Sequence, residues 1–273
     1  MVCGLPRSGT TLIGALLNQS PAIEVLNEIP YLSEFPGFRD LIRQYCRWCD
    51  ATRESAHEAW RGMSADVVEE RVEGLLRAFS RALKPFAAPG SPRWDAGEKP
   101  DAPVFCLKRP GLELWADAYE ELFTERKPRY VYCLRDPVEI YGSMLSVPWG
   151  AAQTPEDFVA SLGRSIARIE ELARAGSPNR TFIVNVERAS RNPEERQVMV
   201  QALFKFIGVE PCDRVARFVS EWPPTNRSQQ YYEDRRFVED TVREERVRRL
   251  RRLLAGDRAL TSAVIRLLES GPG

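Results

Sequence analysis

The sequence predicts an α/β protein in which helices flank a parallel β-sheet. Strand-like apolar segments alternate with segments of helical periodicity, which is typical of right-handed strand–helix–strand crossovers. The chain begins with an apolar run, a glycine-containing turn and a helix-like segment. Polar and basic motifs follow several strand-like runs, at the carboxyl ends where parallel sheets bind ligands. A chain of 273 residues can form one large domain or two small ones, and we expect a single domain over 1–273.

The opening elements are a strand, a loop, a helix and a second strand. "VCGL" is a short apolar strand, "TLIGALLNQ" has apolar residues at helical spacing, and residues 22–26, "AIEVL", form the second strand. We expect a helical and loop insertion at about 33–103, because two helix-like segments are followed by a stretch dense in Pro, Gly and Ala at 85–103. This stretch is either a substrate-facing lid or a disordered insertion.

The second half of the chain continues the alternation. Strands are expected at residues 104–108, 129–135 and 181–187. Each is followed by a helix-like segment, namely "LELWADAYEELF", then "PVEIYGSML" opening on Pro137, then "NPEERQVMVQALFKFIG" ending at Gly208.

A helical tail is expected at about 233–269. It is rich in arginine, but acidic residues are interleaved and cancel much of that charge, which argues against an RNA-binding patch. Apolar residues recur on one face, so the charged face is expected to be solvated. The apolar residues are Phe237, Val238, Val242, Val247, Leu250, Leu253 and Leu254.

Composition excludes several classes of protein. Hydrophobic residues make up 43% and charged residues 29%, as in an ordinary globular protein rather than a disordered one. The 39 basic and 39 acidic residues give a net charge of zero, so no nucleic-acid partner is expected and any anion must be bound locally. Only Cys46 and Cys49 form a close cysteine pair, and no second pair has zinc-ligand spacing, so no metal is expected.

The sequence also bears on location. Arg7 interrupts the only candidate signal region, and no run approaches the ~20 apolar residues that a membrane helix needs. Cys3, Cys106 and Cys133 lie in apolar strand-like runs and are expected to be buried free thiols. We therefore expect a cytoplasmic protein without a membrane span.

The loop "GLPRSGTT", residues 4–11, is a candidate anion site. A loop that runs from a strand into a helix turns several backbone N–H groups toward one point at the positive end of the helix dipole. The loop nearly matches the nucleotide-binding pattern G-x-x-x-x-G-K-[ST], but Thr10 stands where the lysine would bind the β- and γ-phosphates. Arg7 offers a fork of donors for a phosphate-type group instead. Gly4 and Gly9 permit the tight path, and Ser8, Thr10 and Thr11 add hydroxyl donors.

A second motif favours a second anion over a magnesium ion. Nucleoside triphosphatases with such a loop place an aspartate at the end of a hydrophobic strand, whereas here "YVYCL" ends in Arg135. Ser143 follows eight residues later (143 − 135), about two helical turns into the next helix. Arg135 and Ser143 can therefore converge on one phosphate.

The two motifs together resemble the sulfotransferase family, whose donor is 3′-phosphoadenosine-5′-phosphosulfate (PAPS). The family has a phosphosulfate loop P-[KR]-[ST]-G-T-T followed by R-D-P-x(5)-S, here "RDPVEIYGS". The resemblance implies a P-loop-like fold, with Arg135 and Ser143 on the 3′-phosphate of PAPS and of its product, PAP. A late loop that closes on the nucleotide is implied near "WPPTNRSQQYYE", with Asn226, Arg227 and Ser228 as candidates. The phosphosulfate loop corresponds to Pro6, Arg7, Ser8, Gly9, Thr10 and Thr11.

Sulfuryl transfer also needs a base for the acceptor's proton. His57, the one histidine, lies in a helix-like stretch away from the strand ends and is expected on the surface. "GLPRSGTTL…LNQSPAIEVLNE" resembles the branch that contains tyrosylprotein sulfotransferases and bacterial small-molecule sulfotransferases, which uses a glutamate shortly after the second strand. This resemblance implies Glu28 as the base, with a pKa raised by partial desolvation. Glu24 is nearer the strand and less well placed.

A cation must stabilise the departing phosphate oxygen. "FCLKRPGLEL" resembles the lysine-bearing strand end of the same branch, which implies Lys108 on the sulfuryl or bridging oxygen and Arg7 on the 5′-phosphosulfate. Arg109 is an alternative cation, and a structural ion pair is the alternative role for Lys108.

The sequence therefore predicts a PAPS-dependent sulfotransferase that sulfates a hydroxyl or an amine without a metal. The acceptor is a small molecule, a lipid or a saccharide, and the sequence leaves its identity open. The oligomeric state is equally open, with a homodimer as one option. Two other functions remain alternatives at this point, namely an ATP-dependent small-molecule kinase and a non-catalytic nucleotide-binding protein.

Overall fold

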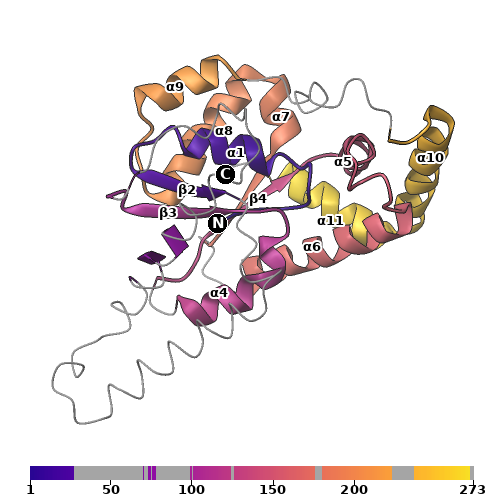
Figure 1. Ribbon diagram of the computed structural model, residues 1–273, viewed down its shortest axis with the longest axis horizontal. Coiled ribbons are helices and arrows are strands. Elements are labelled where there is room, and N and C mark those ends of the chain that lie inside the picture. The colour runs from indigo at the N-terminus through magenta and orange to yellow at the C-terminus, as the bar shows by residue number, and fades with distance from the viewer. Residues whose placement is uncertain are drawn as a thin grey trace, which may run out of the picture.

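The computed structural model describes residues 1–27, 70, 73–74, 76–77, 99, 101–123, 126–175, 180–222 and 237–270. These residues form an α/β fold with a five-stranded sheet whose hydrogen-bonded pairs are all parallel, in the order β2-β3-β1-β4-β5 (Figure 1). The predicted fold class is confirmed. Most of the insertion expected at 33–103 lies outside the described residues. The strands are β1 (Val2–Cys3), β2 (Ile23–Asn27), β3 (Val104–Lys108), β4 (Tyr130–Leu134) and β5 (Thr181–Asn185).

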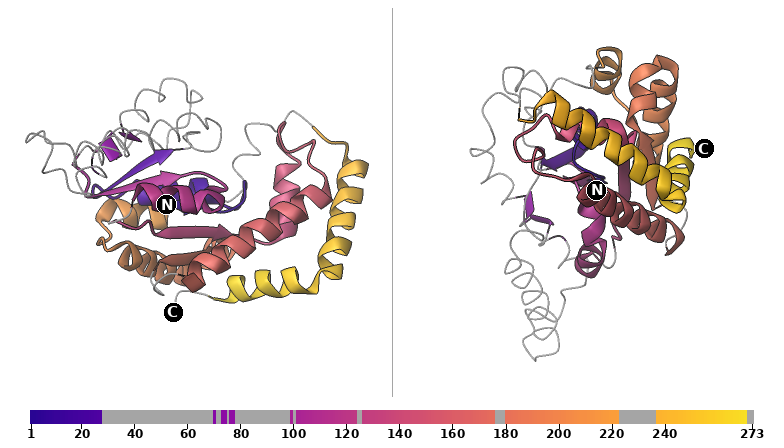
Figure 2. Two further views of the ribbon diagram at one scale, coloured as in Figure 1. Left: turned by 90° about the horizontal axis from the view of Figure 1, so that it is seen from below. Right: turned by 90° about the vertical axis from the view of Figure 1, so that its right-hand side faces the viewer.

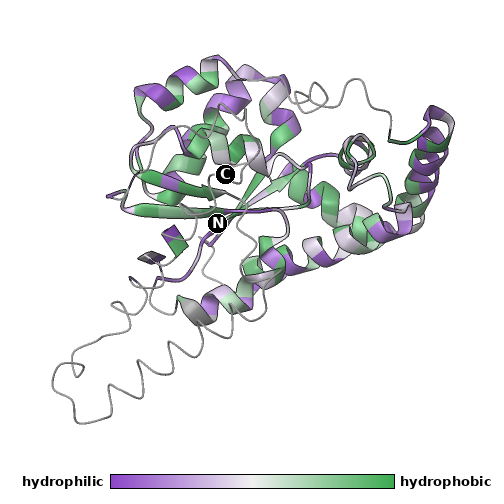
Figure 3. Cartoon of the chain, viewed as in Figure 1, coloured by the Kyte–Doolittle hydropathy of each residue, from purple (hydrophilic) through white to green (hydrophobic). Residues whose placement is uncertain are grey.

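Alternation along the strands divides the core into two layers. In β4, Val131 and Cys133 belong to one apolar cluster, while Tyr130, Tyr132 and Leu134 belong to the other. Successive strand residues point to opposite faces, so a central strand that is apolar throughout must be covered on both sides. Figure 3 shows the strands as mostly hydrophobic, with helices on both faces.

Different helices cover the two faces. The face that carries Val131 and Cys133 forms the first layer. It packs against α1 (Thr10–Leu17), α7 (Val186–Arg191), α8 (Pro193–Ile207) and α9 (Asp213–Ser220). The face that carries Tyr130, Tyr132 and Leu134 forms the second layer. It packs against the short 3₁₀ helix η2 (Leu112–Trp115) and against α4 (Ala116–Leu122), α5 (Pro137–Met144) and α6 (Pro155–Ala175). The helices α10 (Asp240–Gly256) and α11 (Arg258–Glu269) complete this layer.

The two C-terminal helices lie on the outside of α6, as both views of Figure 2 show. The Arg243 guanidinium in α10 donates to the carbonyl oxygen of Gly142 in α5 at 3.0 Å, and Arg246 donates to that of Ala151 at 2.6 Å. Leu250 is fully buried, whereas most of the charged side chains of α10 are exposed. The predicted helical tail is thus present and fastened to the second layer.

Side-chain caps fix several helix ends. The Asp136 carboxylate accepts from the N–H groups of Val138 and Glu139 at 2.7 and 3.2 Å, and Pro137 opens α5 as predicted. Helix α8 ends at Gly208, also as predicted, with a φ of +84°.

The strand expected at 181–187 is shorter in the structure. The expected strand 181–187 ends at Asn185, because the Asn185 side chain accepts a hydrogen bond from the Arg188 N–H at 3.0 Å and begins α7 there. Val186 and Glu187, which were expected in the strand, belong to this helix.

The cysteines and the longest helix complete the comparison with the sequence. Cys3, Cys106 and Cys133 are buried free thiols, as predicted. Helix α6, with 21 residues, was not anticipated by the sequence analysis. Among the described helices, none has the length and apolar character needed to cross a membrane.

Candidate active site

The loop between β1 and α1 has the backbone of an anion cradle. Gly4, Arg7 and Gly9 have positive φ values of +122°, +70° and +104°. Gly4 and Gly9 also need to lack a side chain, because a Cβ would lie 2.3 Å from the Cys133 carbonyl oxygen at Gly4 and 2.7 Å from the side chain of Val186 at Gly9. This path ends at the N-terminus of α1, where backbone N–H groups favour an anion.

Arg7 and Ser143 bring the two sequence motifs together. The Arg7 Nε donates to the Ser143 hydroxyl at 3.0 Å, although Arg7 follows β1 and Ser143 lies in α5 after β4. The two strands are neighbours in the sheet, so the segments that follow them meet at the same edge. Arg7 is not a glycine, and a left-handed backbone costs it about 1 to 3 kcal/mol, a strain that is common at functional sites.

Two buried polar atoms near this point have no hydrogen-bond partner among the described residues. They are the hydroxyl of Ser8 and the Nε of Arg135, in residues that are 0% and 8% exposed. Another guanidinium nitrogen of Arg135 donates to the Glu139 carboxylate at 3.3 Å. Buried polar groups normally have partners, because leaving one unpaired costs about 1 to 3 kcal/mol. Both atoms are therefore suited to a ligand that supplies acceptor oxygens.

Lys108 lies at the carboxyl end of β3, next to β1 and β2. It is 1% exposed, and the sheet register pairs it with Val2 on one side and Asn27 on the other. Burial raises the pKa of the Cys133 thiol in β4, and the positive charge of Lys108 opposes that shift. Arg109 is less buried, and its backbone N–H donates to the Val2 carbonyl at 3.1 Å.

Comparison with known proteins identifies the family of the chain. A family model described as "Sulfotransferase family" matches residues 1–213. The chain belongs to the sulfotransferase family. This sulfotransferase is therefore an enzyme of that family. No curated protein matches the chain.

Solved structures similar to this sulfotransferase include three bacterial ones. The sulfotransferase domain of the Synechococcus PCC 7002 olefin synthase is 14% identical with a TM-score of 0.46, and the match covers 98% of this chain and 92% of that chain. Sulfotransferase STF9 from Mycobacterium avium is 17% identical with a TM-score of 0.46, and the match covers 93% of this chain and 74% of that chain. The sulfotransferase domain from the curacin biosynthetic pathway is 13% identical with a TM-score of 0.45, and the match covers 93% of this chain and 96% of that chain.

The described part of the enzyme contains most of the predicted site residues. Those of the loop, β3, β4 and α5 meet at the carboxyl edge of the sheet. They are Pro6, Arg7, Ser8, Gly9, Thr10, Thr11, Lys108, Arg135 and Ser143. The predicted base Glu28, the late-loop residues Asn226, Arg227 and Ser228, and His57 lie outside the described residues. In the described ranges, no group of three His, Cys, Asp or Glu side chains is placed to hold a metal ion.

Glu24, the acid considered less suitable than Glu28, has a structural partner. It lies in β2, is 5% exposed and forms an ion pair with Arg77. Arg77 also pairs with Glu73 and donates to the carbonyl oxygen of Ala102 at 3.1 Å. Glu24 therefore ties part of the insertion to the sheet.

The sequence analysis did not single out Glu113, which lies beside the loop. Its carboxylate accepts from the Gly4 N–H at 3.1 Å and from the Ser165 hydroxyl at 2.5 Å. Glu113 lies in η2, within a segment that reads as an amphipathic helix, so only the tertiary contact reveals it.

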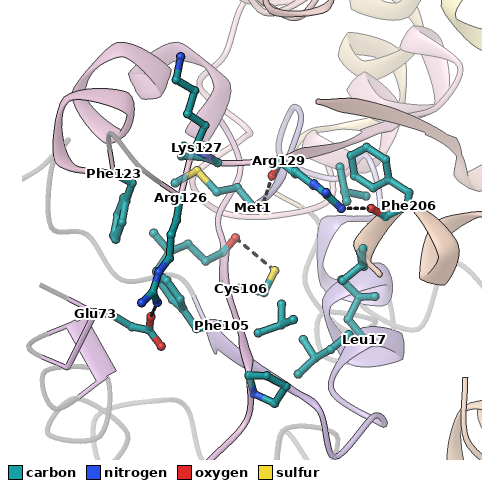
Figure 4. Close-up of a pocket in the computed structure, with 17 residues that line it drawn as sticks. Met1, Leu17, Glu73, Phe105, Cys106, Phe123, Arg126, Lys127, Arg129 and Phe206 are labelled. Atoms are coloured by element: carbon teal, nitrogen blue, oxygen red, sulfur yellow. Dashed lines mark hydrogen bonds and ion pairs between the residues drawn. The ribbon is translucent and has the colours of Figure 1, made fainter. Parts of the chain in front are cut away.

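A cavity of about 460 Å³ lies at the opposite edge of the sheet (Figure 4). Its lining includes Met1, Phe105, Phe123 and Phe206, from the amino-terminal side of the strands, and Arg126. The residues that line it include none of the loop 4–11 and not Ser143, so this cavity is separate from the candidate active site.

Proposed function

We propose that this sulfotransferase transfers a sulfuryl group from PAPS to a hydroxyl or amine of an acceptor, with Glu28 as the general base. The observation that carries the proposal is the meeting of Arg7 and Ser143, 3.0 Å apart, at the edge where Ser8 and Arg135 present unpartnered buried donors. These groups are hydrogen-bond donors, and an anion with several oxygens is the ligand that they suit.

PAPS has two anionic parts, and the described residues offer two sets of hydrogen-bond donors. The backbone N–H groups of the loop and the Ser8 hydroxyl suit the 5′-phosphosulfate. Arg135 and Ser143, on the neighbouring strand end and helix, suit the 3′-phosphate. Arg7 can serve both parts, because it lies on the loop and contacts Ser143. When bound, PAPS supplies an activated sulfur whose leaving group is PAP.

The proposed chemistry is an in-line displacement at sulfur. Glu28 takes the proton from the acceptor as its oxygen or nitrogen forms a bond to sulfur. Lys108 and Arg7 stabilise the negative charge that develops on the bridging phosphate oxygen as the old S–O bond breaks. Glu28 directly follows Asn27, which is in register with Lys108, and this adjacency supports a base and a cation at one edge of the sheet.

The two alternatives have less support. A kinase needs a cation at the position of Thr10 and an acid at the end of β4 to hold magnesium. Here Arg135 directly follows β4, and the next residue, Asp136, caps α5. A non-catalytic nucleotide-binding protein would have no need of a buried lysine at the end of β3 or of a glutamate directly after β2 in the sequence. Among acceptors, the neutral net charge favours a small molecule, a lipid or a saccharide over a highly anionic polymer.

Isothermal titration calorimetry with PAP tests the donor. We expect PAP to bind without magnesium and ATP to bind at least about tenfold more weakly, because ATP lacks a 3′-phosphate. Absence of PAP binding, or ATP binding that requires magnesium, contradicts the proposal and favours the kinase.

A further inference from the structure

A buried carboxyl group lies next to the start of the phosphosulfate loop. Glu113 is 0% exposed, and its Oε2 accepts a hydrogen bond from the Gly4 N–H at 3.1 Å. Its Oε1 accepts from the Ser165 hydroxyl at 2.5 Å, and that hydroxyl is 2.7 Å from the hydroxyl of Tyr132. Glu113 therefore connects the first residue of the loop to β4 and to α6.

The same segment holds the other polar backbone group of Gly4. The Gly111 N–H donates to the Gly4 carbonyl oxygen at 2.9 Å. Gly4 has little room to move, because its Cα packs so closely on β4 that a Cβ would lie 2.3 Å from the Cys133 carbonyl oxygen. Since its N–H and its C=O both bond to residues 111–113, this segment sets the direction in which the chain enters the loop.

The environment of Glu113 suits a neighbouring anion. Burial raises the pKa of Glu113, against the opposite effects of the Ser165 hydroxyl and the Gly4 N–H. A raised pKa favours the uncharged acid, which does not repel phosphates at the loop. In the acid form the bond between Ser165 and Glu113 reverses its direction: the Glu113 O–H donates to Ser165, and the Ser165 hydroxyl is then free to donate to Tyr132.

We propose, resting on the donor site proposed above, that Glu113 is a positioning residue for the binding of PAPS. Its carboxyl group fixes the buried N–H of Gly4, and through Gly4 it fixes the path of residues 5–9. The backbone N–H groups and the Ser8 hydroxyl of the loop then face the donor before it arrives. Glu113 acts only through the loop and contacts neither the donor nor the acceptor.

The test compares two substitutions by calorimetry with PAP. Glu113→Leu removes the acceptor of the Gly4 N–H, and we expect the Kd for PAP to rise about tenfold or more. Glu113→Gln keeps a carbonyl oxygen for Gly4 and an N–H₂ that can donate to Ser165, and we expect a Kd within about threefold of the wild-type value. Rescue by glutamine is what a positioning role predicts.

Tyr132→Phe is the matched control. It removes the far end of the network and leaves the contact between Glu113 and Gly4 in place. We expect its melting temperature to fall and its Kd for PAP to stay at the wild-type value. Equal losses of PAP affinity in Tyr132→Phe and Glu113→Leu would indicate a general loss of stability and overturn the positioning role.

Two further measurements keep the outcome decisive. If Glu113→Leu does not fold, Ser165→Ala takes its place in the test. This substitution removes the hydroxyl that bonds to the Oε1 of Glu113, and we expect the Kd for PAP to rise about two- to fivefold. An unchanged Kd in that variant overturns the role of Glu113. The wild-type protein is titrated first, because failure of PAP to bind there contradicts the donor itself, whereas normal wild-type binding with an unchanged Glu113→Leu contradicts only the positioning role.

Discussion

The Nε of Arg7 donates a hydrogen bond to the hydroxyl of Ser143 at 3.0 Å, across 136 positions of the sequence. Parallel pairing of β1 with β4 brings the two residues together, because each follows the carboxyl end of its strand. The bond holds an arginine and a hydroxyl at one place, so that both can contact the same donor molecule.

Ser143→Ala is expected to weaken PAP binding about five- to tenfold, because the phosphate loses a hydroxyl donor and Arg7 loses its partner. Calorimetry with PAP measures the change. Ser146→Ala is a control near the end of the same helix, since the Ser146 hydroxyl donates only to the Gly142 carbonyl, at 3.2 Å. Similar losses in the two variants would argue against a role for Ser143 in binding.

Arg135→Met is expected to remove most of the discrimination between PAP and adenosine 5′-monophosphate, which lacks the 3′-phosphate. In the wild-type protein we expect PAP to bind about 10- to 100-fold more tightly, the range for a charged hydrogen bond. Competition titrations with both nucleotides measure the ratio. Glu139→Gln removes the carboxylate 3.3 Å from Arg135 and should keep the preference. A preference of undiminished size in Arg135→Met places the 3′-phosphate elsewhere.

Glu28→Gln and Glu24→Gln are expected to fail in different ways. Glu28→Gln should lower the rate of PAP release from PAPS about 100-fold or more, measured with a hydroxyl acceptor that the wild-type enzyme uses, and leave PAP affinity unchanged. Glu24→Gln breaks the buried pair with Arg77 and should lower the melting temperature by roughly 4 to 8 °C while leaving turnover intact. Normal turnover in Glu28→Gln removes Glu28 from its role as the base.

Gly9→Ala is expected to destabilise the protein more than Gly111→Ala. Both glycines have positive φ, which costs alanine about 1 kcal/mol. A Cβ on Gly9 would also lie 2.7 Å from the side chain of Val186, whereas one on Gly111 would meet no atom within 4 Å. Urea unfolding of both variants measures the difference in the free energy of unfolding. Equal values would mean that Val186 moves aside without cost.

Glu113 is expected to make stability fall as the pH rises above 4.5. Burial raises the pKa of Glu113 above its ordinary value of 4.5, so the folded state keeps a proton that the unfolded state has lost. Because the folded state then binds more protons, its free energy of unfolding decreases with increasing pH until the folded state also releases the proton. Unfolding in urea at several pH values should show this decrease relative to Glu113→Gln. Parallel curves for the two proteins would contradict the raised pKa.

Local patterns predicted the parts of the site that local geometry determines. The path of residues 4–11 and the spacing of Arg135 and Ser143 follow from a strand, a turn and a helix, and the structure has all of them. Helix α6 was missed, although Phe158, Leu162, Ile166 and Ile169 recur at helical spacing and Thr154 accepts from the Asp157 N–H at 3.1 Å as a cap.

Contacts between distant segments could not be predicted in this way. A glutamate in the middle of "GLELW" reads as an exposed helix residue, and nothing in its neighbourhood indicates a bond to Gly4, 109 positions away. The end of β5 was misplaced because "TFIVNVE" is strand-like throughout, while the Asn185 cap begins a helix inside it. The base Glu28 stays a prediction, since it lies outside the described residues.

The bond from Arg243 to the carbonyl oxygen of Gly142 crosses the limit of the family match, which ends at residue 213. Leu250, Leu260, Ala263 and Val264 likewise come from beyond that limit and are buried in the second layer. The packed core therefore extends beyond the residues that the family model matches. A fragment that ends at residue 213 would keep every described motif residue. It would, however, expose apolar side chains of the second layer and lose the hydrogen bond to the Gly142 carbonyl, next to Ser143.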